Sequence, residues 1–327
     1  MEKDFTSNSF FSDNERYADI INGIGCEGVP FVKGKDLREL DTRVNFGRFS
    51  RHGHRRRGKT LYRDLIRKTP FGINFAIIGI ENQEEIDYAL PLRVLFYDAG
   101  EYEKQAAQIR REVRREKKGL SVGEYLYGFK KSNRLFPVVT FVLYYGEKEW
   151  NGAKDLHGLL DFTDIPEVLK GKISNYQIHV VEVRKLTDTS IFKTDVKQVF
   201  DFIRFSGNKQ KLKELVTSDE SYAFLEEDAC DMVLSYVGEE KMFKIKEKHK
   251  KGGKVNMCQG LREWMEDERT EGRIEGMNKG RIEGRAEGED RFASLTENLI
   301  KNGRTDDLMH AAIDKQYREA LFKELRL

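Results

Sequence analysis

Two hydrophobic segments joined by turn-forming residues stand out in the first third of the chain. Residues 60–68 are rich in β-branched, aromatic and aliphatic side chains, and residues 73–80 form an apolar run. Short runs of this composition, bounded by turn formers, are typical of β-strands. Gly72 stands between them, where a two-residue type II′ turn needs its first central residue. The pattern therefore predicts a β-hairpin.

The predicted register of this hairpin brings polar side chains together. With Gly72 as first central residue, Phe71 pairs with Asn74 and Asp64 falls opposite Glu81, their Cβ atoms about 4.5–5.5 Å apart. Gln83, two residues after Glu81, points to the same face. Two carboxylates and an amide are oxygen donors of the kind that Mg²⁺ prefers, and an amide can orient a water molecule. A cross-strand salt bridge with neighbouring basic residues is the alternative that the spacing leaves open.

Helical periodicity and further apolar runs predict more of an α/β domain. A capping-box pattern from Ser12 to Glu15 lies within a predicted helix over residues 8–24. Residues 84–118 predict a long helix, and the apolar run 135–145 predicts the most buried strand of the sheet. Other predicted elements are strands at 40–46 and 178–183 and helices near 155–170, 192–205 and 209–236.

The last quarter of the chain carries a short repeat. Glycine recurs at every fourth position from Gly272 to Gly288. On a helix this spacing makes a stripe, and each interior glycine costs about 1 kcal/mol relative to alanine. A helix that dimerises through the stripe and a loose spacer are both open. The basic stretch 241–254 before the repeat, which contains Gly-Gly, predicts a linker, and 292–300 and 306–325 predict two amphipathic helices.

Composition narrows the class of protein. The 327 residues, 39% hydrophobic and 35% charged, allow one sizeable α/β domain with an appendage, and the net charge of +2 says nothing about nucleic acid. We expect no membrane segment, because no stretch approaches about 18 apolar residues and no signal sequence is recognisable. The three cysteines lack paired spacing, which favours a reducing, cytoplasmic location.

Basic residues gather just before the first strand of the predicted hairpin. The loop contains Arg55, Arg56, Arg57 and Lys59. Such a cluster neutralises backbone phosphates with an affinity that falls as salt rises, although many charged runs are simply solvated. Both interpretations remain open for this loop.

A second basic candidate lies on the long predicted helix. Pro91 predicts a kink or a new start, and Arg93 shares a helical face with Tyr97 four residues on. Arg93 either meets a phosphate or pairs with an acid of the sheet. The basic end of this helix, residues 110–118, either extends a DNA-binding surface or is a soluble helix end.

The order of these features resembles the PD-(D/E)XK nuclease superfamily. Asp64 is followed by an apolar strand that ends in Glu81-x-Gln83, and then by a helix with Pro91-x-Arg93. More narrowly, the chain resembles the Rpn-type recombination-promoting nucleases, also described as PD-(D/E)XK family transposases. The segments that carry this resemblance are residues 10–22, 61–68, 77–83, 90–105 and 136–162.

The resemblance implies a metal-dependent DNA endonuclease linked to recombination or mobile DNA. Asp64 and Glu81 would bind Mg²⁺ or Mn²⁺, and Gln83 occupies the position of the usual lysine. The family often adds an acid from the first helix, for which Asp19 and Glu15 are candidates, with surface charge or capping as the alternative role. DNA is the implied partner, and the Arg55–Arg57 loop, Lys59 and Arg93 would contact it.

The implied fold class is α/β, with a restriction-endonuclease-like core, a mixed sheet flanked by helices, and a helical C-terminal extension. The predicted parts are a nuclease-like domain at 1–240, a basic linker and helix at 241–270, the glycine repeat at 271–289 and a helical hairpin at 290–327. Because glutamine replaces lysine, the alternative is a catalytically inactive DNA-binding or self-associating protein. A third interpretation is an interaction protein that acts through the 271–289 helix as a homo-oligomer.

Overall fold

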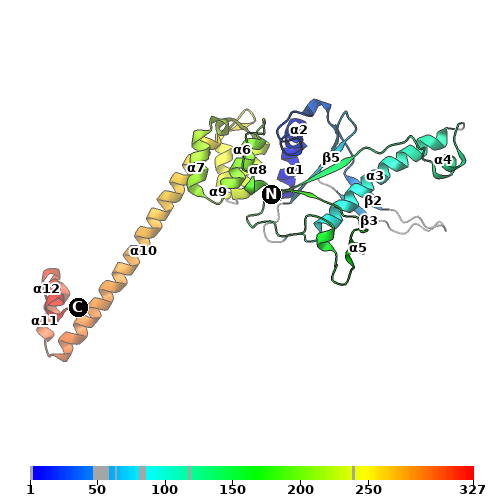
Figure 1. Ribbon diagram of the computed structural model, residues 1–327. Coiled ribbons are helices and arrows are strands. Elements are labelled where there is room, and N and C mark those ends of the chain that lie inside the picture. The colour runs from blue at the N-terminus through cyan, green and yellow to red at the C-terminus, as the bar shows by residue number, and fades with distance from the viewer. Residues whose placement is uncertain (1–2, 47–58, 63–64, 81–85, 117–118, 238–239) are drawn as a thin grey trace. The chain divides into compact units, whose positions relative to one another are not determined.

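The computed structural model describes residues 3–46, 59–62, 65–80, 86–116, 119–237 and 240–327 (Figure 1). They form two compact units, Met1–Leu261 and Arg262–Leu327. No helix in the described ranges combines the length and the apolar character that crossing a membrane requires.

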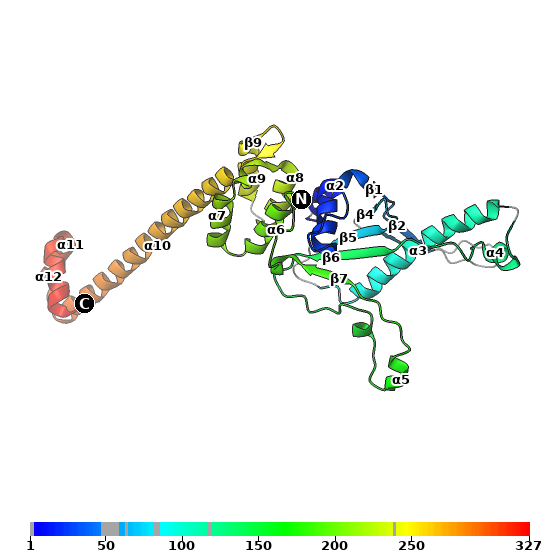
Figure 2. The ribbon, with the colours of Figure 1, turned by 45° about the horizontal axis from the view of Figure 1, so that its top comes forward.

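A mixed five-stranded sheet is the centre of the first unit (Figure 2). Its strands follow the order β1–β4–β5–β6–β7, with antiparallel pairing as far as β5 and parallel pairing from β5 to β7. The α/β class is therefore confirmed. The strand bounds are β1 Arg38–Glu39, β4 Leu65–Lys68, β5 Asn74–Ile80, β6 Val138–Tyr144 and β7 His179–Glu182.

Strand β6 is the predicted buried strand. It is a run of β-branched, aromatic and aliphatic residues, and its last five residues are buried. A parallel strand covered on both faces reads as such a continuous apolar run. The run 178–183, predicted as a strand, is β7 with a turn after it.

The hairpin between β4 and β5 has a different turn from the predicted one. Gly72 N–H donates to Thr69 C=O at 3.0 Å, and Thr69 N–H donates to Ile73 C=O at 2.9 Å. Pro70 therefore lies in a turn, and Gly72 follows it with φ +87°, as in three-residue loops that end in a left-handed glycine. An added Cβ on Gly72 would lie 2.3 Å from the Phe136 ring, so the site needs glycine for space as well.

The predicted register is consequently wrong over the described part of the hairpin. The prediction paired Lys68 with Ile77, whereas Lys68 pairs with Asn74 and Ile77 pairs with Leu65. The shift is three residues, because the loop consists of residues 70–72 and not of the predicted residues 72 and 73. The predicted strand at 60–68 also divides, since β3 (Lys59–Tyr62) pairs with β2 (Arg43–Phe46) in a separate two-stranded sheet.

Helices cover both faces of the main sheet. On one face, Arg67 of β4 donates from Nε to Asn14 Oδ1 at 3.0 Å, at the start of α2 (Asn14–Ile20). On the other face, Thr140 of β6 donates to Asp98 Oδ1 of α3 (Leu90–Arg115) at 2.7 Å. Helix α3 packs there through a cluster of buried residues: Leu90, Val94, Tyr97, Val142, Tyr144, Trp150 and Ile178.

The helix starts can be compared with their sequence signals. The cap of α2 is Asp13, whose carboxylate accepts from Glu15 N–H at 2.9 Å and Arg16 N–H at 3.0 Å. Ser12, the predicted cap, is instead the last residue of α1 (Lys3–Ser12). The predicted helix at 8–24 is thus interrupted. Helix α3 begins at Leu90 with proline in its first turn, which confirms the new start at Pro91.

The remainder of the first unit is mostly helical. The basic segment 241–254 is folded, in contrast to the predicted linker, because Lys246 is only 6% exposed and pairs with Asp231 at 2.6 Å and Glu227 at 3.1 Å. A small sheet pairs its residues 250–255 with β8. The elements are α4 Val122–Tyr127, α5 Glu167–Lys170, α6 Val196–Phe205, α7 Lys209–Ser218, β8 Leu225–Glu226, α8 Glu227–Val237, α9 Glu240–His249, β9 Lys250–Lys251 and β10 Lys254–Val255.

The glycine repeat is helical. It lies within α10 (Met257–Lys301), a helix of 45 residues, and its five glycines have no neighbouring atom within 4 Å of an added Cβ. Two further helices, α11 (Thr305–Ile313) and α12 (Lys315–Leu325), form a hairpin. Their core with the end of α10 contains Leu295, Leu299, Ala311, Leu321 and Phe322. Oligomerisation through the repeat stays a prediction.

Candidate functional site

The three predicted catalytic residues, Asp64, Glu81 and Gln83, lie outside the described residues. The same holds for Arg55, Arg56 and Arg57, and of Lys59 only the backbone, at the start of β3, is described. Their roles therefore stay predictions. The structure does describe the edge of the sheet where β5 ends. Its last residue, Ile80, directly precedes the Glu81-x-Gln83 motif in the sequence.

This edge is built by the carboxyl ends of three parallel strands. Ile80 of β5 is in register with Tyr144 of β6, which is in register with Glu182 of β7. The first turn of α3 lies against the same edge, because Leu90 packs with Tyr144 and Trp150. In open α/β sheets, ligands bind beyond the carboxyl ends of the strands. The described residues thus form a candidate site at the edge where the chain leaves β5.

Arg93 is the one predicted DNA-binding residue whose side chain is described. It lies in the first turn of α3, where its NH1 group pairs with Asp87 Oδ2 at 2.9 Å. The buried Nε atom finds no hydrogen-bond acceptor among the described residues. The guanidinium is 38% exposed, so it can still contact a ligand. Tyr97, predicted on the same helical face, is instead buried in the core.

Glu182 is the described carboxylate at this edge. Its Oε2 accepts from Trp150 N–H at 3.0 Å and pairs with Lys185 at 3.2 Å, while Oε1 lies 3.7 Å from Lys154 Nζ. Burial works to raise the pKa of Glu182, but the Trp150 N–H and the two ammonium groups outweigh it, so its pKa lies below the ordinary 4.5. Glu182 is therefore ionised, and its carboxylate is already bound by Trp150 and Lys185 of the same chain.

The Glu182→Gln protein is expected to lose about 1–3 kcal/mol of unfolding free energy at neutral pH, because hydrogen bonds to a charged acceptor are replaced by weaker ones. A carboxyl group whose pKa is lowered by folding stabilises the protein above its unfolded pKa, and this contribution disappears as the pH falls through the folded value. The difference from wild type should therefore shrink below about pH 4.5. Urea unfolding at several pH values measures it, and a difference independent of pH would contradict this account.

A metal site can be judged only by the chemistry of its predicted donors. The described residues contain no group of three or more histidine, cysteine, aspartate or glutamate side chains arranged to hold a metal. Asp64 and Glu81 are hard oxygen donors, which suit Mg²⁺ or Mn²⁺. Glu182 is not a spare ligand, because Trp150 and Lys185 already occupy its carboxylate.

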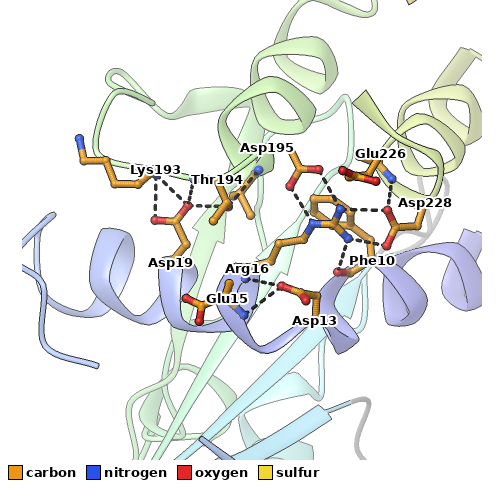
Figure 3. Close-up of polar contacts among 12 residues, drawn as sticks. Phe10, Asp13, Glu15, Arg16, Asp19, Lys193, Thr194, Asp195, Glu226 and Asp228 are labelled. Atoms are coloured by element: carbon orange, nitrogen blue, oxygen red, sulfur yellow. Dashed lines mark hydrogen bonds and ion pairs between the residues drawn. The ribbon is translucent and has the colours of Figure 1, made fainter. Parts of the chain in front are cut away.

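The candidate acids of the first helix have structural partners (Figure 3). Asp19 is 5% exposed and accepts from Lys193 N–H at 2.8 Å, Thr194 N–H at 2.7 Å and Thr194 Oγ1 at 2.7 Å. Glu15 accepts from Gly34 N–H at 3.3 Å. Both acids therefore hold the backbone of other segments in place, and the buried Asp19 is neither the surface charge nor the helix cap of the alternative.

A buried arginine, Arg16, lies one turn away from Asp19 (Figure 3). Its Nε and NH2 groups donate to Asp195 at 2.7 and 2.8 Å, and NH2 also donates to Asp228 Oδ1 at 2.9 Å. NH1 donates to Asp228 Oδ2 and to Phe10 C=O. These contacts use all five N–H groups of the guanidinium. Arg16 thus joins α2 to the starts of α6 and α8.

This arginine cluster borders a surface hollow of about 880 Å³. Burial raises the pKa of the Asp195 carboxyl group above its ordinary value, although Arg16 beside it acts in the opposite direction. The guanidinium of Arg16 and the carboxylates of Asp195 and Asp228 bind one another, so this cluster is structural. Sequence reasoning missed Arg16, whose only signal is an arginine beside the buried residues Phe10, Phe11, Tyr17 and Ala18.

Comparison with known proteins gives one match. Residues 120–221 match the family model described as "Putative transposase, YhgA-like". This is the PD-(D/E)XK Rpn-like transposase family, so the resemblance recognised in the sequence is confirmed. The matched segment contains β6, β7 and α6 but not Asp64, Glu81 or Gln83. Neither the curated proteins nor the solved structures gave a match.

Proposed function

We propose that this chain is a metal-dependent DNA endonuclease with a PD-(D/E)XK core, because residues 120–221 match the model of the YhgA-like putative transposase family. Its role would be phosphodiester hydrolysis in recombination or in the movement of mobile DNA. The family match covers residues 120–221, and most of the segments that carry the resemblance lie before residue 106. The two observations support this proposal together, because they concern largely different parts of the chain.

The observation that carries the proposal is the edge of the mixed sheet where β5 ends. An antiparallel hairpin, the helix α3 and the parallel strand β6 follow in this order, which fits the sheet flanked by helices that the resemblance implies. Arg93 lies in the first turn of α3, and its side chain is 38% exposed although NH1 pairs with Asp87. A phosphate is a ligand that a half-exposed guanidinium binds well.

The chain's residues would divide the work as follows. Asp64 and Glu81 would hold Mg²⁺ or Mn²⁺, an ion that supplies activation of water and stabilisation of charge on the phosphate. Gln83 would orient the attacking water through its amide, since glutamine cannot take its proton at neutral pH. Arg93 and the basic residues 55–57 and 59 would bind phosphates and position the strand.

A catalytically inactive DNA-binding protein of the same fold is the second candidate. Glutamine at position 83 favours it, because the lysine that the superfamily usually has there is absent. The two candidates share the DNA-binding surface and differ only in chemistry. Binding without cleavage is the result that would select this second function.

Plasmid cleavage by the purified full-length chain tests the proposal. We expect nicking or linearisation with Mg²⁺ or Mn²⁺ and none with EDTA, while binding to DNA in EDTA persists and weakens with added salt. A folded protein that binds DNA and leaves the plasmid intact with either metal would overturn the nuclease proposal. Cleavage that continues in EDTA would contradict the metal requirement.

A further inference from the structure

Helix α3 continues past the sheet and carries α4 near its far end (Figure 2). We call residues 106–134 the α3–α4 arm. Its sequence has nine lysine and arginine residues against three glutamates, a net charge of +6, whereas the whole chain has +2. The rest of the chain therefore has a net charge of −4, and this short segment is what makes the whole chain positive.

Three arginines of the arm lie on one outward face of α3. Val113 is 2% exposed, so its side of the helix is covered. Arg111 and Arg115, each two positions from Val113, lie about 200° round the helix from it. Arg114 is the neighbour of Arg111 at three residues' spacing, which puts their side chains side by side. All three are exposed.

These three arginines have no acidic partner within the ranges that the structure describes. The nearby acids are engaged elsewhere: Glu116 pairs with Lys130, Glu103 pairs with Arg110 at 2.7 Å, and Glu112 accepts from Gln108 at 3.0 Å. A row of unpaired guanidinium groups is suited to the phosphates of a nucleic-acid backbone, which they bind through two parallel hydrogen bonds.

Helix α4 presents aromatic side chains near the far end of α3 (Figure 2), where Gly128 lies against Arg110. Tyr125 and Tyr127 are 75% and 73% exposed, and α4 has no buried residue. The helix is nevertheless well fixed. Ser121 and Glu124 form a capping box in which Ser121 N–H donates to Glu124 at 2.9 Å, and Gly128 closes the helix with φ +67°. The tyrosines are thus held in place without being used in any core.

We propose that the α3–α4 arm binds DNA, with Arg111, Arg114 and Arg115 on backbone phosphates and Tyr125 and Tyr127 stacked on unpaired bases. This inference rests on the proposed function for its partner, DNA, and adds a preference for single-stranded DNA. Aromatic side chains stack on any base whose face is free, and a base in a duplex offers none. A second copy of the chain fits less well, because a symmetric contact would bring two arms of like charge together.

The test measures DNA binding by the full-length chain in EDTA, so that cleavage plays no part. A labelled oligonucleotide is used as a single strand and as a duplex, over a series of salt concentrations. The arginine variant is R111Q/R114Q/R115Q, and its matched control is K209Q/K211Q/K213Q, which removes the same charge from α7. The tyrosine variant is Y125A/Y127A, and its control Y125F/Y127F retains both rings.

For single-stranded DNA, the arginine variant should flatten the dependence of log affinity on log salt by about 2, since each phosphate contact contributes about 0.7. The α7 control should leave that slope close to wild type. Y125A/Y127A should weaken binding to the single strand by roughly tenfold or more and leave duplex binding nearly unchanged, whereas Y125F/Y127F should bind like wild type.

Three results would overturn the proposal: an arginine variant that behaves like the α7 control, a Y125A/Y127A protein with unchanged affinity for the single strand, or a full-length chain that binds no DNA at low salt. Circular dichroism and thermal melting check that the variants fold. The outcome is separate from that of the nuclease proposal. Metal-dependent cleavage together with unchanged DNA binding by the arm variants would contradict only the arm proposal. DNA binding that depends on the arm, without cleavage, would contradict only the nuclease proposal.

Discussion

The Asp64→Asn and Glu81→Gln proteins are expected to lose at least about a hundredfold in metal-dependent DNA cleavage and to keep their affinity for DNA. Charge stabilisation by a bound metal is worth several kcal/mol, and each 1.36 kcal/mol is a factor of ten in rate. The isosteric amides keep the shape of the side chain and remove the negative charge that attracts the cation. Initial rates of plasmid nicking at saturating Mg²⁺ measure the effect.

The control for these variants is Glu214→Gln. Glu214 is an exposed acid on α7 that accepts a hydrogen bond from Gln210 at 2.7 Å, so its loss should leave the rate unchanged. Cleavage at the wild-type rate by both acid variants would show that the hairpin acids are not metal ligands. A loss in only one of them would leave the other acid without its proposed role.

The Arg16→Met protein is expected to lose about 3–5 kcal/mol of unfolding free energy, the cost of leaving buried charge without its partner. Arg16 has a side chain 8% exposed, and its removal leaves the carboxylates of Asp195 and Asp228 facing each other. Methionine retains much of the arginine stem, so the loss reports charge and hydrogen bonds more than packing. Urea unfolding monitored by circular dichroism measures the change.

Arg43→Met is the matched control. Arg43 pairs with Asp41 at 3.0 Å, but the two side chains are 62% and 54% exposed, and exposed pairs contribute about 0–1 kcal/mol. The triple variant Arg16→Met, Asp195→Asn, Asp228→Asn should recover part of the stability, because it removes the stranded charges as well. If Arg16→Met were as stable as the Arg43 control, the cluster would not be a structural joint.

The elements that the sequence predicts best are those determined by burial. Strand β6 could be identified because both of its faces are covered, which makes the sequence continuously apolar. The start of α3 could be placed because Pro91 favours the first turn of a helix and is excluded from its interior. Each of these signals depends only on the residue and its immediate neighbours.

The errors arise where several local solutions compete. Pro70 and Gly72 both signal a turn. The register follows from which residues the turn includes, and a loop at 70–72 in place of 72–73 moves the pairing by three residues. Ser12 and Asp13 are both good caps at adjacent positions. The basic run 241–254 has the composition of a linker, but Lys246 is buried against acids of α8 and thereby holds α9 in place.

The candidate site shows the same division. Arg93 was identified as a candidate from its place after Pro91, and the structure puts it in the first turn of α3 with Asp87 as its partner. The Arg16 cluster could not be predicted, because Asp195 and Asp228 are 179 and 212 residues away in sequence. No periodicity or spacing rule relates positions so distant from each other.

The separation of these partners has a consequence for synthesis on the ribosome. Arg16 acquires its last acidic partner only after residue 228 has been made, 212 residues later. At about 5–20 residues per second, the first two helices wait roughly 10–40 s for α8. During that time their apolar surfaces and the charge of Arg16 remain without their final partners. Folding of the N-terminal helices is thus delayed by chain topology, and this interval is when nascent chains depend most on protection from aggregation.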